Sequence, residues 1–311
     1  MAPRGPTSAG AWPDITLSSW EGTKDALHLW TQIVGKVRLA LAPMLNQWWQ
    51  VTLYVSARGL TTSLMPDGTR GVEMEFDFFD HQLQIRTTDG QRRSIPLQPC
   101  SVADFYAATT GALAEVGVPV HLLARPVELP DATPFPRDTT VRPYDPDAAH
   151  RFWLALVQVS RVMGDFRARF QGKVSPVHFF WGAADMAVTR FSGRRAPTHP
   201  GGVPNCPDWV QELAYNEEVS SCGFWPGGSD EGTFYAYAYP VPDGFAEWPV
   251  APAEARFDEE LGEFVLPYRA VRTADDPDAL LLRFFQTTYE AAAELAGWDR
   301  ASLEVAGWPH G

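Results

Sequence analysis

The sequence has 311 residues, of which 45% are hydrophobic and 13% aromatic, a composition typical of a globular protein with a large core. The formal net charge of -13 disfavours nucleic acid and anionic lipid, and no run approaches the roughly 20 apolar residues that span a bilayer. Three widely spaced cysteines without a Cys-x-x-Cys pair argue against a disulfide framework, so we expect a cytoplasmic protein. From its charge and hydropathy we expect no nucleic-acid or membrane partner.

The chain is expected to begin with a disordered tail, residues 1–15, which lack a clear apolar pattern. A helix is predicted from Thr23 to Leu41, where apolar residues recur at helical spacing. His28, Gln32 and Lys36 stand four residues apart on this helix and therefore share one side of it. This polar stripe indicates either a solvent-facing edge or a helix side that faces a cleft.

Short strands and a second helix are predicted next. The expected strands are 51–57, 72–78, 82–87 and 120–123. Asp80-His81 is typical of a turn, although a base with its orienting carboxylate would look the same. The Ser101-x-x-Asp104 capping box predicts the start of a helix that ends near Gly117.

The second half of the chain repeats this order of elements. Helices are predicted at about 147–170 and 278–296, and strands at 177–190, 218–224 and 233–239. Residues 51–57 resemble 177–183, and 105–116 resemble 284–295, although two amphipathic helices can resemble each other by chance. We therefore predict an α+β protein of two similar, duplicated halves, each an antiparallel sheet with flanking helices.

The expected organisation is a first half over residues 16–125, a proline-rich crossover over 126–146 and a second half over 147–311. Two such halves would pack as two lobes or share one sheet. In both arrangements the boundary between them is the natural place for a ligand.

Ionisable residues are concentrated along 177–190 and in the loop that follows. His178 lies in an apolar strand, where it is either a hydrogen-bonded structural histidine or a general base or metal ligand. Asp185 lies farther along the same stretch. Arg190 and Arg194 could bind an anionic group through their guanidinium groups, or form a solvated basic patch.

Glu217 and Glu218 alternate sides on the next predicted strand, so one of them can face inward. An inward carboxylate near His178 would make an acid/base set. With His178 and His199 it would instead make a two-histidine, one-carboxylate metal site, and a salt bridge to Arg190 is the simpler alternative.

Twelve tryptophans exceed what an ordinary core needs. Trp181 and Trp225 are candidate walls of a pocket, and Tyr237 belongs to a row of tyrosines on one strand face, although packing alone would also explain them. The Phe224-Trp225 loop could instead form a contact in an oligomer. No Gly-x-Gly-x-x-Gly or phosphate-loop lysine motif is present, so a nucleotide cofactor bound in either of these ways is not expected, and the sequence identifies no other cofactor.

Several motifs resemble those of a widespread bacterial family of unknown function. They include Val177–Gly182 (VHFFWG), Thr189–Gly193 (TRFSG) and Gly223–Gly227 (GFWPG), and the likeness extends over nearly the whole chain. The resemblance implies one unit of characteristic length and brings no activity with it.

The leading prediction is an enzyme that acts on a small anionic or aromatic molecule in the cleft between the halves. Its expected catalytic residues are His178, Asp185, Glu217 and Glu218, and its expected substrate-binding residues are His28, Lys36, Trp181, Arg190, Arg194, Trp225 and Tyr237. One alternative is a metal-dependent enzyme that uses His178, His199 and a carboxylate. The other is a non-catalytic protein that binds a small molecule.

Overall fold

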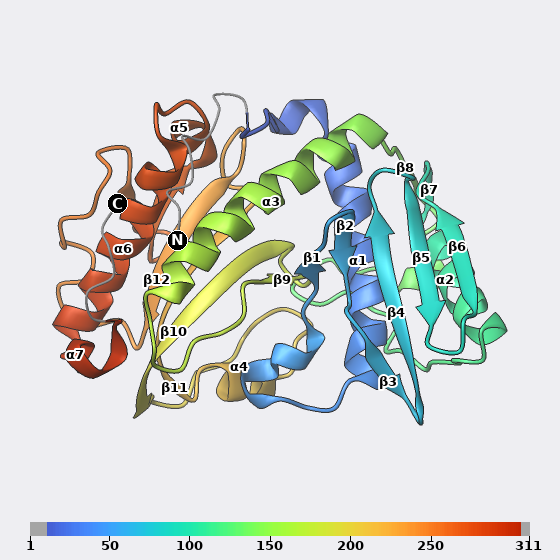
Figure 1. The fold of residues 1–311 in the computed structure, drawn as a ribbon, viewed down its shortest axis with the longest axis horizontal. Helices are drawn as coiled ribbons and strands as arrows, with labels where there is room; N and C mark the ends of the chain where they lie inside the picture. Colours follow the sequence, from blue (N-terminus) through green and yellow to red (C-terminus); the bar gives the residue numbers. More distant parts are fainter. Residues whose placement is uncertain (1–10, 306–311) are drawn as a thin grey trace.

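The computed structural model describes residues 11–305 and has an α+β fold, as predicted (Figure 1). The helices are α1 (Glu21–Leu41), α2 (Val102–Glu115), α3 (Pro146–Ala168), α4 (Asp208–Ala214), α5 (Tyr268–Arg272), α6 (Pro277–Leu295) and α7 (Arg300–Leu303). A short 3-10 segment, η2 (Asn46–Val51), follows α1. Within residues 11–305, no helix combines the length and apolar character that a membrane crossing requires.

Two antiparallel sheets of six strands make up most of the remaining structure. The first contains β1 (Tyr54–Val55), β2 (Gly59–Thr61), β3 (Met65–Asp67), β4 (Arg70–Asp77), β5 (Gln82–Thr87) and β6 (Arg92–Pro96). The second contains β9 (His178–Phe180), β10 (Asp185–Arg195), β11 (Glu217–Trp225), β12 (Thr233–Tyr239), β13 (Arg256–Asp258) and β14 (Glu263–Pro267). A two-stranded ladder joins β7 (Cys100–Ser101) to β8 (Val141–Arg142).

Helices α1 and α2 lie behind the first sheet in Figure 1. The predicted strand 72–78 corresponds to β4, whose Met74 and Phe76 are buried in the core that these helices share. Phe105 of α2 stacks on Trp30 of α1 with ring centroids 4.7 Å apart and also on Phe76. These aromatic contacts fix both helices on the apolar face of the sheet.

Helices α3 and α6 cover one face of the second sheet, where α3 crosses in front of the strands in Figure 1. Phe234 of β12 packs against Phe285 of α6 and against Phe224 of β11. The other face of this sheet is left for α4 and for the segments that line a cavity.

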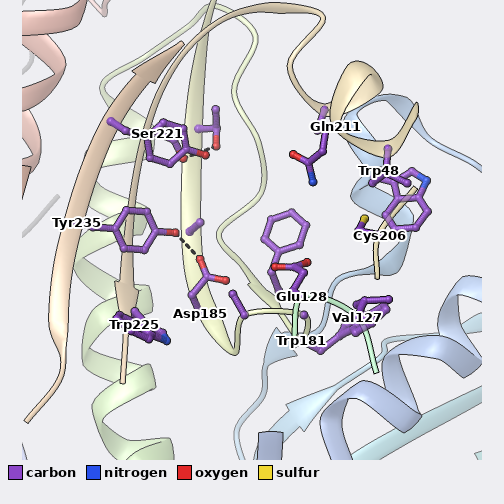
Figure 2. A pocket seen from close by; sticks show the side chains of 18 of the residues that line it. Trp48, Val127, Glu128, Trp181, Asp185, Cys206, Gln211, Ser221, Trp225 and Tyr235 are labelled. Atoms are coloured by element: carbon purple, nitrogen blue, oxygen red, sulfur yellow. Dashed lines mark hydrogen bonds between the residues drawn. The ribbon is translucent and has the colours of Figure 1, made fainter. Parts of the chain in front are cut away.

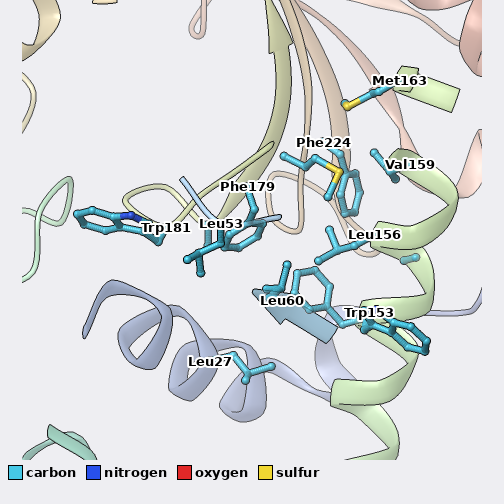
Figure 3. Packing of buried hydrophobic residues seen from close by; sticks show 14 of the residues in the cluster. Leu27, Leu53, Leu60, Trp153, Leu156, Val159, Met163, Phe179, Trp181 and Phe224 are labelled. Atoms are coloured by element: carbon cyan, nitrogen blue, oxygen red, sulfur yellow. The ribbon is translucent and has the colours of Figure 1, made fainter. Parts of the chain in front are cut away.

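The two sheets meet edge to edge, because Leu53 and Phe179 exchange backbone hydrogen bonds of 2.8 and 2.9 Å. Figure 3 shows Leu53, Leu60, Phe179 and Leu156 packed together between α1 and α3. One hydrophobic core therefore runs across both predicted halves. Each half has a helix before and after its strands, and the internal duplication itself stays a prediction.

Four local expectations are wrong. Of the predicted strand 51–57 only β1, Tyr54–Val55, is a regular strand, and Val51 belongs to η2. Residues 177–190 form a hairpin of β9 and β10 rather than one strand, because the chain turns at 181–184 and Ala184 adopts a φ of 59°. Residues 120–123 are irregular rather than a strand. Residues 11–15 are part of the core, since Trp12 packs against Tyr268 at 5.8 Å between ring centroids, whereas the rest of the predicted tail lies outside the described residues.

Candidate functional site

A cavity of about 680 Å³ lies on the face of the second sheet that α3 and α6 leave uncovered. Side chains alternate along the strands of this sheet, so every second residue faces the cavity. On β10 these residues are Asp185, Ala187, Thr189 and Phe191. Residues of α1 and η2 in the first half, and of the crossover, also line the cavity.

Aromatic side chains from distant segments form the walls. Trp48 of η2 meets Trp209 of α4 edge to face at 5.5 Å between ring centroids. Trp181, in the turn between β9 and β10, donates a 2.7 Å hydrogen bond from its indole N–H to the carbonyl oxygen of Val51. A Cβ atom at Gly35 of α1 would lie 2.2 Å from the Trp181 ring, so only glycine lets the indole pack here. Trp181 is thereby fixed between α1 and η2.

Carboxyl groups from three segments line the same cavity. Asp185 at the start of β10 accepts a hydrogen bond from the Tyr235 hydroxyl of β12. Glu128 belongs to the crossover, has a φ of 62° and donates a 2.7 Å backbone hydrogen bond to Pro204. Glu263 of β14 is the third. Figure 2 shows Asp185 and Glu128 directed into one space.

The environment raises the pKa of all three carboxyl groups. Burial raises the pKa of Asp185 to about 6, and the Tyr235 hydrogen bond opposes this effect. Burial and the nearby Asp185 carboxylate raise the pKa of Glu128 to about 7 and that of Glu263 to about 7. These groups can therefore both donate and accept a proton near neutral pH.

The polar stripe on α1 faces the second half of the protein. Gln32 is fully buried, accepts the N–H of Val127 at 2.8 Å and donates to the carbonyl oxygens of Val127 and Gly182. His28 Nε2 lies 2.7 Å from the Gly182 carbonyl oxygen. A Cβ atom at Gly182 would lie 2.1 Å from a Glu128 carboxylate oxygen. Gln32 and His28 therefore hold together the two segments that carry Glu128 and Asp185.

Lys36 is the next residue of the stripe and lines the cavity itself. Its Nζ lies 5.8 Å from the centre of the Trp181 ring, and the residue is only 4% exposed. Burial lowers the pKa of Lys36 to about 8, while the Cys206 thiol acts in the opposite direction.

Six of the residues predicted from the sequence line the cavity. They are Lys36, His178, Trp181, Asp185, Trp225 and Tyr237. Tyr237 shares a 2.8 Å hydrogen bond with the Tyr215 hydroxyl. His178 is buried and its Nδ1 lacks a hydrogen-bond partner among the described residues, and burial lowers its pKa to about 3. His178 is therefore neutral at physiological pH. Trp225 is partly exposed, whereas its neighbour Phe224 is buried.

The other predicted site residues have partners outside this cavity. Glu217 pairs with Lys173 at 2.6 Å. Glu218 pairs with Arg194, whose guanidinium also donates to the Ala296 carbonyl oxygen just after α6. These three charged groups hold strand ends and a helix end together. His28, as described above, bonds to the Gly182 turn.

Arg190 does not bind a ligand in this cavity, because it occupies the opposite face of β10. Its guanidinium lies 3.5 Å from the centre of the Phe166 ring and 4.3 Å from that of Tyr289, and it donates to the Phe166 carbonyl oxygen. Burial lowers the pKa of Arg190 to about 10. The sequence pattern could not reveal which face of the strand would carry the pocket.

The metal site predicted around His178 and His199 is not assembled. The His199 ring instead stacks on Tyr215 at 4.7 Å, and its Nδ1 accepts the N–H of Gly201. Among residues 11–305, no three His, Cys, Asp or Glu side chains are grouped so that they could hold a metal ion.

The sequence did not point to Glu128, Glu263 or Cys206. Glu128 lies in the proline-rich crossover, and its position depends on Gln32 from a helix almost a hundred residues earlier. Glu263 precedes the buried Phe264 on β14, so the two side chains lie on opposite faces of the strand. This alternation is the one feature of the sequence that could have indicated Glu263 as a site residue.

We expect Arg190→Met to change the free energy of unfolding by less than about 1.5 kcal/mol, because an apolar chain of similar length can fill the space between the aromatic rings. Arg190→Ala should cost about 2–4 kcal/mol, since it leaves a void. Urea unfolding of both variants would test this packing role. Equal losses in the two variants would show that the guanidinium itself is needed.

The sequence profile of DUF5996, a family of unknown function, matches residues 12–305. The curated proteins contain no match to this chain, and neither do the solved structures. The match spans both sheets and every segment that lines the cavity. The chain therefore belongs to this family of unknown function, DUF5996.

Proposed function

We propose that this protein is an enzyme that acts on a small organic molecule bound in the cavity, with Asp185 and Glu128 exchanging protons with it. The observation that carries the proposal is the convergence of buried carboxyl groups, whose pKa values are raised toward neutrality, on one aromatic cavity. Ionisation of a buried carboxyl group lowers the stability of a fold, and carboxyl groups with shifted pKa values are concentrated in active sites. Carboxyl groups with raised pKa values are effective general acids and bases.

The walls favour a substrate with an aromatic or apolar body over a highly charged anion. Trp48, Trp181 and Phe191 offer apolar surface, whereas three carboxyl groups repel an added negative charge. The two arginines predicted to bind an anion lie elsewhere. Lys36 is the buried amine that this cavity offers to a polar group of the substrate.

A non-catalytic binding protein is the second candidate. The observation in its favour is the mouth of the cavity, where exposed Trp209, Trp225 and Leu261 would contact a ligand without taking part in chemistry. Consumption of a compound distinguishes the two candidates, because a binding protein retains its ligand unchanged.

The test is to incubate the purified protein with a mixture of cellular small molecules and to follow their amounts by mass spectrometry. The wild type should consume a compound, and Asp185→Asn should slow its consumption at least about 100-fold while still binding it. The matched control is Glu73→Gln, which removes a carboxylate that accepts a hydrogen bond from Thr61 in the first sheet and should keep the wild-type rate. Binding without consumption would favour the binding protein, and an unimpaired Asp185→Asn enzyme would contradict the proposed role of Asp185.

A further inference from the structure

The chain contains only three lysines, Lys24, Lys36 and Lys173, but 22 arginines. Lys24 pairs with Asp25 at 2.8 Å. Lys173 pairs with Glu217 at 2.6 Å and lies over an aromatic ring. Both are partly exposed at the side chain, at 24% and 28% respectively. They have ordinary structural roles for a surface lysine.

Lys36 differs from the other two lysines in both burial and pairing. Only 4% of the surface of Lys36 is exposed, and the residue lines the cavity. Within residues 11–305 its amine has no hydrogen bond or ion pair, and its Nζ lies 5.8 Å from the centre of the Trp181 ring. Lys36 Nζ therefore has no partner within the described residues and is open to the cavity, where a polar group of a ligand can reach it.

The surroundings of Lys36 favour its neutral amine. Burial lowers its pKa to about 8, so about a tenth of the amine is unprotonated at pH 7, far more than for an exposed lysine. A neutral lysine amine in an apolar pocket is a nucleophile for carbonyl carbon, which an arginine cannot be. The Cys206 thiol interacts electrostatically with both Lys36 and Glu128, and all three residues line the cavity.

We propose that Lys36 forms an imine with a substrate that carries an aldehyde or ketone next to an aromatic or apolar body. This inference rests on the proposed function, because it names the substrate class of the same cavity. Lys36 Nζ would add its lone pair to the carbonyl carbon while the C=O π bond opens, and one proton moves from nitrogen to oxygen, which gives a carbinolamine with one hydroxyl group and one N–H. The C–O bond then breaks, and the hydroxyl leaves as water with a proton from a carboxylic acid.

The acid is a carboxyl group of the same cavity, and Glu128 is the one that shares the neighbourhood of Cys206 with Lys36. Nitrogen forms the C=N double bond as its proton returns to the carboxylate, so one amine and one carbonyl give one imine and one water. The carboxyl group is regenerated in the process. No oxidant or reductant enters this step.

Reductive trapping tests the proposal with benzaldehyde as the probe. The full-length protein is treated at pH 7.5 with benzaldehyde and sodium cyanoborohydride, which reduces an imine to a stable N-benzyl amine. Digestion and mass spectrometry then give the rate of modification at each lysine. We expect Lys36 to be modified at least about tenfold faster than Lys24 and Lys173, although both of these are more exposed.

Modification of Lys36 at or below the rate of Lys24 would overturn the proposal. Lys36→Met serves as the control, since Lys24 and Lys173 should react in it at their wild-type rates. The outcome is separable from that of the proposed function. A slow Lys36 together with consumption that depends on Asp185 would overturn the imine alone, whereas a fast Lys36 with an unimpaired Asp185→Asn enzyme would overturn the acid/base role of Asp185 alone.

Discussion

At pH 8, Asp185→Asn is expected to increase the free energy of unfolding by about 2–3 kcal/mol. Burial raises the pKa of this carboxyl group from 3.8 to about 6, which means that ionising it costs free energy in the folded state. Asparagine has nearly the same shape and can still accept the hydrogen bond from Tyr235. The substitution therefore removes the cost of a buried charge without leaving a void.

The pH dependence gives this prediction its sign. Below about pH 4 the carboxyl group is protonated in both folded and unfolded chains, so wild type and Asp185→Asn should be about equally stable. Between about pH 4 and 6 the unfolded chain loses the proton first, and the stability of the wild type falls relative to the variant. Above about pH 6 both states are ionised and the difference stays constant.

Urea unfolding of wild type and Asp185→Asn at pH 4, 6 and 8 measures this difference directly. A matched Glu73→Gln variant should show no such growing gain, because Glu73 lies on the first sheet and bonds with Thr61. A loss of stability in Asp185→Asn at pH 8 would mean that the charge of Asp185 stabilises the fold. Such a result would contradict a raised pKa for the Asp185 carboxyl group.

The second large effect is expected from Gly35→Ala, which should lower the free energy of unfolding by about 3 kcal/mol. The added Cβ would lie 2.2 Å from the ring of Trp181, and both groups are buried. The indole cannot move aside easily, because its N–H is hydrogen-bonded to Val51. The clash between the alanine Cβ and the indole can be relieved only if Trp181 moves out of its position or if α1 shifts relative to the second half.

Gly164→Ala is the matched control, because Gly164 also lies within a helix but its Cβ would meet nothing within 4 Å. This variant should gain up to about 1 kcal/mol through the higher helix propensity of alanine. Urea unfolding of the two variants would show opposite signs. A stable Gly35→Ala protein would mean that Trp181 is not held tightly in the cavity wall.

Much of the fold could be predicted from local sequence signals. The Ser101 capping box is present as expected, since the Ser101 hydroxyl accepts the N–H of Asp104 at 3.1 Å. The predicted strand 233–239 matches β12, and the predicted helix 278–296 differs from α6 by one residue at each end. These elements follow from side-chain periodicity and from a cap, both of which depend on neighbours along the chain.

The errors fall where distant contacts decide the local structure. The turn at 181–184 includes a positive φ at Ala184, which the apolar sequence does not predict. Gln32 of α1 donates a hydrogen bond to the carbonyl oxygen of Gly182 in this turn. Trp12 is ordered because Tyr268, more than 250 residues away in the chain, packs against it. Periodicity cannot predict contacts of this kind.

Only part of the candidate site could be predicted, because some of its residues depend on contacts between distant parts of the chain. Asp185, Trp181 and Lys36 line the cavity, and they could be singled out because polar residues in apolar segments and closely spaced aromatic residues are visible in the sequence. Arg190 was assigned to the site although it faces the helices, because strand alternation gives two faces without saying which one is hollow. Glu128 was missed because a loop carries it, and only the folded chain brings that loop beside Asp185.

The measurement that tests the central claim most directly is the titration of Asp185 in the folded protein. Carbon-13 NMR of protein labelled at the aspartate carboxyl carbons gives the midpoint for each Asp, and the signal absent from Asp185→Asn identifies this residue. A midpoint at about pH 6 is the result that the structure predicts. A midpoint near pH 4, as for an exposed aspartate, would contradict the account of a buried acid/base site in this cavity.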